Sequence, residues 1–345
     1  LCCGTGVGFS CERKETDQLP VVPPLVRDEN TVITVEDSRQ GWADALRSLL
    51  DNLYKGIHPT WDVSKVRPKG ERLKTFGGRA SGPEPLERLF KFIVNIFINA
   101  EGRKLTSLNV HDIICMIGEI VIVGGVRRSA LISLSDLDDR DMAMAKSGPW
   151  WENSSQRSLS NNSAVYNTFP GMSRFMEEWA NMYNSHSGER GICNREAMSM
   201  LAAKSGRAPA EFGTNPCSEI ILRPKQFCNL TEVVIRNYDN IATLRHKVRL
   251  AAILGTLQSA CTKFAYLDHE WKMNCEDERL LGVSFTGIYD NKDMSTCSEE
   301  LREGLRVLKQ EVKDTNLEWA ELLGINPSLA TTCCKPSGTT SCVAG

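Results

Sequence analysis

The segment Asn215-Pro-Cys-Ser-Glu219 lies within β-type sequence, shortly before a run rich in Val, Ile and Thr. A residue that precedes proline is disfavoured in the helical region, so Asn215 is expected to be extended. Because side chains alternate between the two faces of an extended chain, Asn215, Cys217 and Glu219 are expected to point the same way. The segment would then place an amide, a thiol and a carboxylate side by side, with a second thiol, Cys228, at the start of the next strand.

Around this segment, helical and strand-like patterns alternate along the chain. One expected helix, with Asp37 or Ser38 as its cap, carries an apolar stripe made of Trp42, Leu46, Leu49, Leu50 and Leu53. Further helices are expected over residues 86–100, 112–123, 175–183, 241–267 and 301–323, strands over 129–134 and 228–236, and a long polar surface loop over 146–162. Strands alternating with amphipathic helices indicate an α/β fold.

Composition narrows the class of protein. The formal net charge of −2 gives no electrostatic case for binding nucleic acid directly, although a nucleotide could bind at a local site. The most apolar run, residues 113–126, is short and contains Glu119, so no membrane association is expected. Thirteen cysteines without an export signal favour reduced thiols and a cytoplasmic location. Neither Cys-x-x-Cys nor His-x-x-x-His spacing occurs, so no metal site is expected.

The motif alone does not establish chemistry. A cysteine in a strand-rich segment is most often a small buried hydrophobe. Polar residues at alternate positions most often form the solvated face of a strand.

A family resemblance gives the motif more weight. The segment resembles the Asn-Pro-Cys-Gly-Glu finger-loop motif of ribonucleotide reductases, in the form typical of the adenosylcobalamin-dependent class; Ser218 stands where the family usually has Gly. Other family-like segments follow in the family's order: Gly4-Thr-Gly-Val-Gly-Phe-Ser10, Phe76-Gly-Gly-Arg-Ala-Ser-Gly-Pro-Glu-Pro-Leu86, Gly125-Val-Arg-Arg-Ser-Ala130, Ser160-Asn-Asn-Ser163 and Lys335-Pro-Ser-Gly-Thr339. The resemblance implies that residues 1–345 form the catalytic domain, a ten-stranded α/β barrel with an inserted finger loop, incomplete at both ends.

The resemblance also implies roles for the residues of the motif. Cys217 would become the thiyl radical that takes the 3′-hydrogen of the ribose, and Glu219 would act as the base at the 3′-hydroxyl. Asn215 would orient the ribose hydroxyls, and Cys228 would be one half of the reducing dithiol. The substrate would be bound by Gly4 and Gly6 of the glycine-rich segment and by Pro336, Ser337, Gly338 and Thr339, whose backbone N–H groups would hold phosphate.

Cofactor and partners follow from the same resemblance. The implied cofactor is adenosylcobalamin, and the substrate is a ribonucleoside tri- or diphosphate. A thioredoxin-like reductant, acting through C-terminal cysteines outside this chain, and a nucleotide effector are expected partners. Two alternatives stay open: a fragment of the large subunit of an oxygen-dependent reductase, and a non-catalytic truncated remnant.

The first prediction concerns turnover. The family's partner thiol for Cys228 lies upstream of the glycine-rich segment, so this chain is expected to lack it. With adenosylcobalamin and a reductant, the purified chain should not form deoxynucleotide over many equivalents, because one thiol cannot close the disulfide that the reduction requires. Sustained turnover would show that Cys2 or Cys3 serves as the partner, or that the placement of the chain in the family is wrong.

Overall fold

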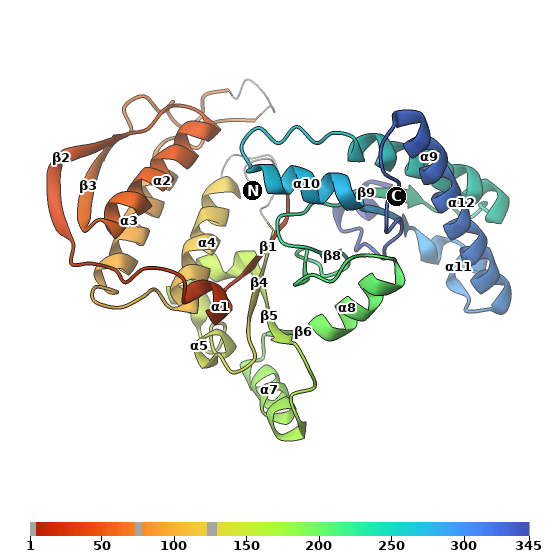
Figure 1. The fold of residues 1–345 in the computed structure, drawn as a ribbon, viewed down its shortest axis with the longest axis horizontal. Coiled ribbons are helices and arrows are strands. Elements are labelled where there is room, and N and C mark those ends of the chain that lie inside the picture. Colours follow the sequence, from red (N-terminus) through yellow and green to blue (C-terminus); the bar gives the residue numbers. More distant parts are fainter. Residues whose placement is uncertain (1–4, 73–77, 123–129, 345) are drawn as a thin grey trace. The chain divides into compact units, whose positions relative to one another are not determined.

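The structure is a computed structural model that describes residues 5–72, 78–122 and 130–344. It divides into two compact units, Leu1–Asn194 and Arg195–Gly345, which are described separately (Figure 1). Both units mix helices with strands, so the expected α/β class is confirmed. No helix in the described ranges is long and apolar enough to cross a membrane.

The first unit contains a parallel sheet and a helical layer. Its elements are β1 (Val7–Ser10), α1 (Arg13–Thr16), β2 (Val26–Thr34), α2 (Arg39–Tyr54), β3 (Ile57–Asp62), α3 (Glu84–Ile98), α4 (Ser107–Ile122), β4 (Leu131–Asp136), α5 (Arg140–Ala143), α6 (Trp150–Asn153), η1 (Ser155–Leu159), β5 (Ser160–Tyr166), α7 (Met172–Ser185) and β6 (Gly191–Asn194). Strands pair in the order β1-β4-β5-β6, all parallel, whereas β2 pairs with β3 in a separate parallel ribbon.

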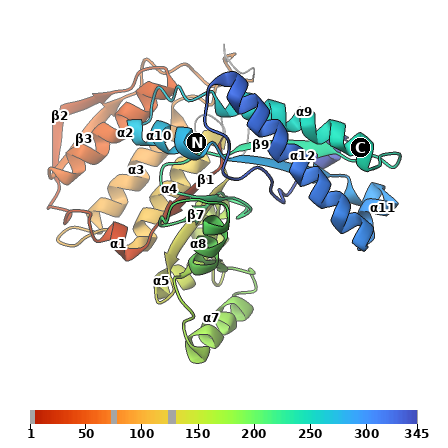
Figure 2. The same ribbon diagram turned by 45° about the vertical axis from the view of Figure 1, so that its right-hand side comes forward.

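The predicted amphipathic helix of this unit is α2. Ser38 caps it by accepting a hydrogen bond from the Gly41 N–H at 2.9 Å, as its sequence predicts. Leu49 and Leu53 of its apolar stripe are fully buried, and the other stripe residues pack against the same core. This core joins α2 to β3, α3 and α4, and Figure 2 shows these helices beside the β2–β3 ribbon.

The second unit is built on a shorter parallel pair of strands. Its elements are α8 (Arg195–Lys204), β7 (Gly213–Thr214), β8 (Ile221–Leu222), β9 (Asn229–Val234), α9 (Ile241–Ser259), α10 (His269–Glu278), β10 (Leu281–Thr286), η2 (Ile288–Asp290), α11 (Lys292–Ser295), α12 (Glu299–Leu323) and α13 (Thr339–Ala344). β9 and β10 run parallel, and Thr332 forms a further parallel bridge with Val283 of β10.

Helices α9 and α12 cover one face of the β9–β10 pair. Val233 and Val283 belong to a core that includes Val248 of α9 and Leu308 and Val312 of α12. Because strand side chains alternate, the opposite face carries the even-numbered residues of both strands. This second face includes the polar and sulfur-bearing side chains considered below.

Outside the Cys217 motif, two expectations about secondary structure are wrong. Residues 146–162 do not form a surface loop, because they contain α6, η1 and the start of β5, and Lys146 is buried. Its ammonium pairs with the Glu189 carboxylate at 2.7 Å and also donates to the Ser160 carbonyl, so the polar composition reflects buried pairs rather than exposure.

The expected helix over residues 241–267 is also too long. α9 ends at Ser259, and a new helix, α10, begins after Asp268, whose side chain accepts from the Glu270 N–H at 3.1 Å. Asp268 is a typical helix-capping residue, but the apolar periodicity before it predicts one continuous helix. The complete ten-stranded barrel stays a prediction.

Gly287 and Gly324 both have a left-handed backbone, and comparing them tests the close approach of Gly287 to Ile235, where β10 and β9 end. A Cβ on Gly287 (φ +76°) would lie 2.5 Å from the Ile235 carbonyl oxygen, whereas one on Gly324 (φ +65°) would meet no atom within 4 Å. G324A should lower the free energy of unfolding by about 1–2 kcal/mol through the left-handed backbone alone. G287A should cost a further ~1–3 kcal/mol because the backbone must shift. Equal losses in urea unfolding would contradict the close approach.

Candidate functional site

The Cys217 motif forms a turn at the end of a short hairpin. β7 and β8 pair in antiparallel fashion, and residues 215–220 connect them. The Asn215 carbonyl accepts a hydrogen bond from the Ser218 N–H at 2.9 Å, which places Pro216 and Cys217 at the two central turn positions. Proline favours the first central position and asparagine the position before it. The prediction of an extended segment is therefore wrong, because Pro216 initiates a turn as well as restricting Asn215.

The turn still brings Asn215 and Glu219 together. The Asn215 Nδ2 donates to Glu219 Oε2 at 2.6 Å, and the Ile220 N–H donates to Asn215 Oδ1 at 3.0 Å. The two side chains meet because the chain reverses between them, whereas an extended strand would have carried them along one face. Cys217 lies at the tip between them and is exposed.

Ser218 adopts a backbone conformation that favours glycine. Its φ is +64°, in the left-handed region. A non-glycine residue there costs roughly 1–2 kcal/mol. The left-handed backbone therefore explains why the family usually has Gly at this position. The sequence alone did not indicate this conformation.

Cys228, just before β9, lies in the electrostatic field of the Glu219 carboxylate. Burial, and then this carboxylate, raise the pKa of Cys228 to about 12. Cys333 is affected in the same way, and burial followed by Glu219 raises its pKa to about 11. Both groups are therefore neutral thiols at pH 7, and Glu219 lies close enough to influence each of them.

Cys333 is a member of this cluster that the sequence did not reveal. The segment around Thr332 joins the strand pair beside β10, and the Cys333 Sγ lies 2.8 Å from the point that a Cβ on Gly282 would occupy. The strand register nevertheless keeps Cys333 and Cys228 apart. Across the sheet they are two strand spacings of ~4.8 Å apart, and along the strands they are about four residues of ~3.3 Å apart. A disulfide needs Cα atoms within about 7 Å, so Cys333 is not placed as the disulfide partner of Cys228.

The expected phosphate-binding residues lie after this bridge. The Lys335 N–H donates to the Ser284 Oγ at 3.0 Å, which attaches the segment to β10. Gly338 has a φ of +57°, and the Ser337 Oγ is buried without a hydrogen-bond partner among the described residues. Pro336 is exposed, and Thr339 begins α13.

The glycine-rich segment belongs to the other unit. Gly6 is exposed just before β1, whereas Gly4 lies outside the described residues, as do parts of the family-like segments 76–86 and 125–130. The structure thus brings Asn215, Glu219 and Cys228 into one neighbourhood, and the substrate-binding roles of Gly4 and Gly6 stay predictions.

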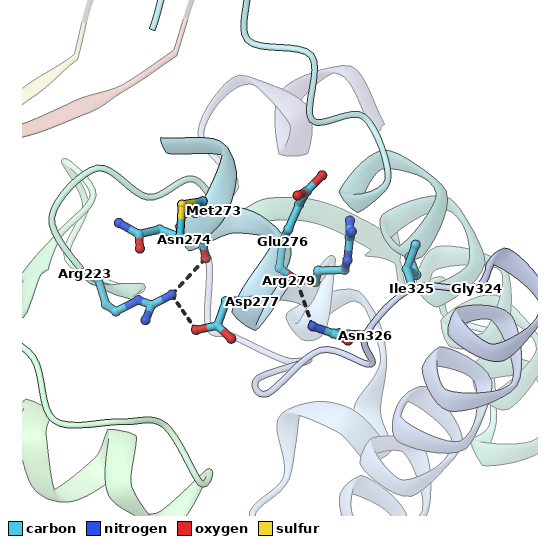
Figure 3. A pocket seen from close by; sticks show the side chains of 9 residues that line it. All are labelled: Arg223, Met273, Asn274, Glu276, Asp277, Arg279, Gly324, Ile325 and Asn326. Atoms are coloured by element: carbon cyan, nitrogen blue, oxygen red, sulfur yellow. Dashed lines mark hydrogen bonds and ion pairs between the residues drawn. The ribbon is translucent and has the colours of Figure 1, made fainter. Parts of the chain in front are cut away.

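A separate cavity in the second unit is not lined by Asn215, Cys217, Glu219 or Cys228. It has a volume of about 690 Å³, and its walls include Arg223, Asn274, Asp277, Arg279 and Asn326. Figure 3 shows Arg223 reaching across to Asp277, with a hydrogen bond of 3.0 Å. Within the described ranges, no group of three or more His, Cys, Asp or Glu side chains is arranged to hold a metal ion.

Comparisons with known proteins support the resemblance seen in the sequence. Residues 16–97 match the family model "B12-dependent ribonucleotide reductase, insertion domain". The adenosylcobalamin-dependent ribonucleoside-triphosphate reductase of Lactobacillus helveticus is 30% identical over 90% of this chain and 46% of its own length. The protein of the same name from Euglena gracilis is 28% identical over 99% of this chain and 46% of its own.

A solved structure shows the same fold. The crystal structure of a B12-dependent (class II) ribonucleotide reductase superposes with a TM-score of 0.79 at 24% identity, covering all of this chain and 55% of that one. The chain is thus related in sequence and in fold to the class II, adenosylcobalamin-dependent ribonucleotide reductases. It spans about half the length of the curated relatives that it matches. Residues 16–97, which match the insertion-domain model, lie within the first unit. The sequence patterns alone did not distinguish them from the rest of the chain as a separate domain.

The turn geometry yields a stability prediction. S218G should raise the free energy of unfolding by about 0.5–1 kcal/mol, since relief of left-handed strain outweighs the greater freedom of glycine in the unfolded chain. S218A, the matched control, keeps a Cβ and should not stabilise. Urea unfolding of the three proteins measures both effects, and an equal gain for S218A would contradict the role of the backbone.

Thiol reactivity provides a second test of the site. In the native chain at pH 8, iodoacetamide should label exposed Cys217 at least about 100-fold faster than Cys228, whose pKa of about 12 leaves little thiolate. E219Q removes a negative charge beside Cys228, so the pKa of this thiol should fall and its labelling should accelerate. Peptide mass spectrometry reads out each cysteine, and an unchanged Cys228 rate in E219Q would place Glu219 away from that thiol.

Proposed function

We propose that the protein carrying this chain reduces ribonucleotides to 2′-deoxyribonucleotides by a thiyl-radical mechanism, for DNA synthesis. The observation that carries the proposal is the turn itself. It exposes the Cys217 thiol at its tip beside the hydrogen-bonded pair of Asn215 and Glu219. The names of the relatives support a ribonucleoside triphosphate as the substrate.

In this proposal Asn215 and Glu219 act as a unit on the ribose. The 2.6 Å hydrogen bond to Asn215 uses Glu219 Oε2 and restrains the carboxylate, which leaves Oε1 to accept a proton from the 3′-hydroxyl. The same bond leaves one N–H of the Asn215 amide for a ribose hydroxyl. Cys217, as a thiyl radical, takes the 3′-hydrogen and returns it at the end of the reaction.

Cys228 supplies reducing hydrogen. Reduction breaks the bond between C2′ and its oxygen, releases water and forms a C2′–H bond, so two electrons and two protons are needed. Two thiols that close to a disulfide provide both. The raised pKa of Cys228 keeps its proton on sulfur, as a hydrogen donor requires. Its partner thiol belongs to the whole protein, and a thioredoxin-like reductant restores the pair.

The donor set at the turn fits adenosylcobalamin in one respect. The Cys217 thiol stands exposed at the tip, where a group from outside the turn can approach it. When bound, the cofactor supplies the radical that removes the hydrogen atom of this thiol. The chain's contribution is to present that sulfur and to keep Asn215 and Glu219 fixed behind it.

The remaining parts of the proposal concern binding and location. Pro336, Ser337, Gly338 and Thr339 bind the substrate's phosphates, and Gly4 and Gly6 also bind the substrate. A nucleotide effector regulates the enzyme, which acts in the cytoplasm on free nucleotides.

Substitutions in the intact enzyme test the proposal. C217S should abolish deoxynucleotide formation, because a hydroxyl O–H bond is too strong to yield the required radical. E219Q should lower kcat by roughly 10²–10⁴-fold, the usual effect of losing a general base. C261S, at an exposed cysteine after α9, is the control and should retain full activity. Substantial turnover by C217S would remove the central assignment.

A further inference from the structure

The hairpin that carries the Cys217 turn is too short to hold its own position. β7 and β8 contribute two residues each, and their register contains two pairs, Gly213 with Leu222 and Thr214 with Ile221. An isolated two-stranded hairpin is at best marginally stable in water. The position of the exposed Cys217 thiol therefore depends on contacts between this hairpin and the rest of the second unit.

A buried arginine makes such contacts with both sides of the hairpin. Arg207 lies in the segment between α8 and β7, and it is buried. Its guanidinium lies over the ring of Phe212, directly before β7, with 4.9 Å between the Cζ atom and the ring centroid. Its Nη1 donates to the Ile221 carbonyl of β8 at 2.9 Å. One side chain therefore holds the two chain segments that lead into and out of the turn.

The same guanidinium is anchored to α10. The Arg207 Nε donates to Glu278 Oε2 at 3.0 Å, and the Glu278 side chain, at the end of α10, is only 1% exposed. Buried Gln226 accepts from Arg207 Nη2 at 3.2 Å and donates to Glu278 Oε2 at 2.6 Å. After α10 the chain enters β10 at Leu281, which pairs with the first residue of β9, next to Cys228. The network thus joins the Cys217 turn to the strand pair beside Cys228.

We propose that Arg207 is the positioning residue of the Cys217 turn, and that it holds the Cys217 sulfur where this sulfur can react with the ribose. The inference rests on the proposed function, in which the sulfur must reach one particular C–H bond. A displacement of ~1 Å can lower the rate of such a step by about 100-fold. Arginine suits this role because its planar guanidinium donates to several acceptors at fixed angles, whereas the ammonium of lysine is a compact charge on a flexible stem.

Hydrogen exchange of the full chain tests the position of the turn without an assay of activity. The N–H of buried Ile220 donates to Asn215 Oδ1, so its exchange reports opening of the turn. R207M should accelerate this exchange by about 10-fold or more, because the hairpin loses its anchor.

The matched control is L308A, which removes a buried side chain from the core between α9 and α12. It should lower the urea midpoint as R207M does, but it should change Ile220 exchange by less than about threefold, since the turn opens locally. Equal acceleration by L308A would show that Arg207 contributes only general stability, and would overturn the proposal.

Kinetics of the intact enzyme, with its cofactor and reductant, test the consequence for the reaction. Per folded molecule, R207M should lower kcat by about 10–100-fold and leave the KM for the nucleotide within about threefold, because Arg207 acts on the turn. R207K keeps a positive charge beside Glu278 and so protects the fold. Its kcat should still be at least about fivefold below that of the unsubstituted enzyme, because a single ammonium cannot reproduce the guanidinium geometry. Full kcat in either variant, or a raised KM with unchanged kcat, would overturn the positioning role.

The two measurements also separate this inference from the proposed function. If R207M accelerates Ile220 exchange but the unsubstituted intact enzyme forms no deoxynucleotide, the anchoring of the turn by Arg207 stands and the proposed function falls. If the unsubstituted enzyme forms deoxynucleotide and R207M forms it at the same rate, the proposed function stands and the role of Arg207 falls.

Discussion

Three parts of the candidate site meet where Gly282 has no side chain. A Cβ at this position would lie 2.5 Å from Leu230 Cδ2, 2.8 Å from Cys333 Sγ and 3.4 Å from Ile220 Cδ1. These atoms come from β9, from the segment beside β10 and from the end of the Cys217 turn. The gap allows the turn to pack on the β9–β10 face, and this packing brings Glu219 near Cys228.

The face itself explains the chemistry that the site can support. Cys228 and Cys333 on this face are partly buried, and this burial, followed by the Glu219 carboxylate, raises the pKa of both thiols and keeps them neutral. The Cys217 thiol is exposed at the turn instead. A single carboxylate, Glu219, lies between these environments and is fixed by the Asn215 amide. The different surroundings of Cys217 and Cys228 suit a reaction in which one sulfur carries a radical and another donates hydrogen. Further along the same strand face lies the ion pair of Lys335 and Glu232.

The sequence predicted the chemistry of this site better than its geometry. The capping of α2 by Ser38 and the positions of α3, α7 and α12 follow local rules, and the structure agrees with them. The extended form of residues 215–219 failed because proline both restricts its predecessor and starts turns, and only the strands on either side decide which effect dominates.

Other features needed long-range pairing that no local pattern encodes. Cys333 joins the cluster through a bridge between Thr332 and Val283, and its sulfur fits only because Gly282 lies beneath it. Lys146 was expected in a loop because its partner, Glu189, is distant in sequence. Burial of paired charges and the register of parallel strands therefore account for most of what the sequence could not show.

The central claim is that Cys217 takes the 3′-hydrogen of a ribonucleotide. The most direct measurement is release of tritium to water from a [3′-³H]ribonucleotide, in the intact enzyme with its cofactor and reductant. Because Cys217 returns the hydrogen at the end of the reaction, tritium reaches water only where the S–³H bond exchanges with solvent first. The account therefore predicts release of a small fraction by the unsubstituted enzyme and none above background by C217S, with C261S behaving as unsubstituted. Release by C217S at the unsubstituted rate would contradict it.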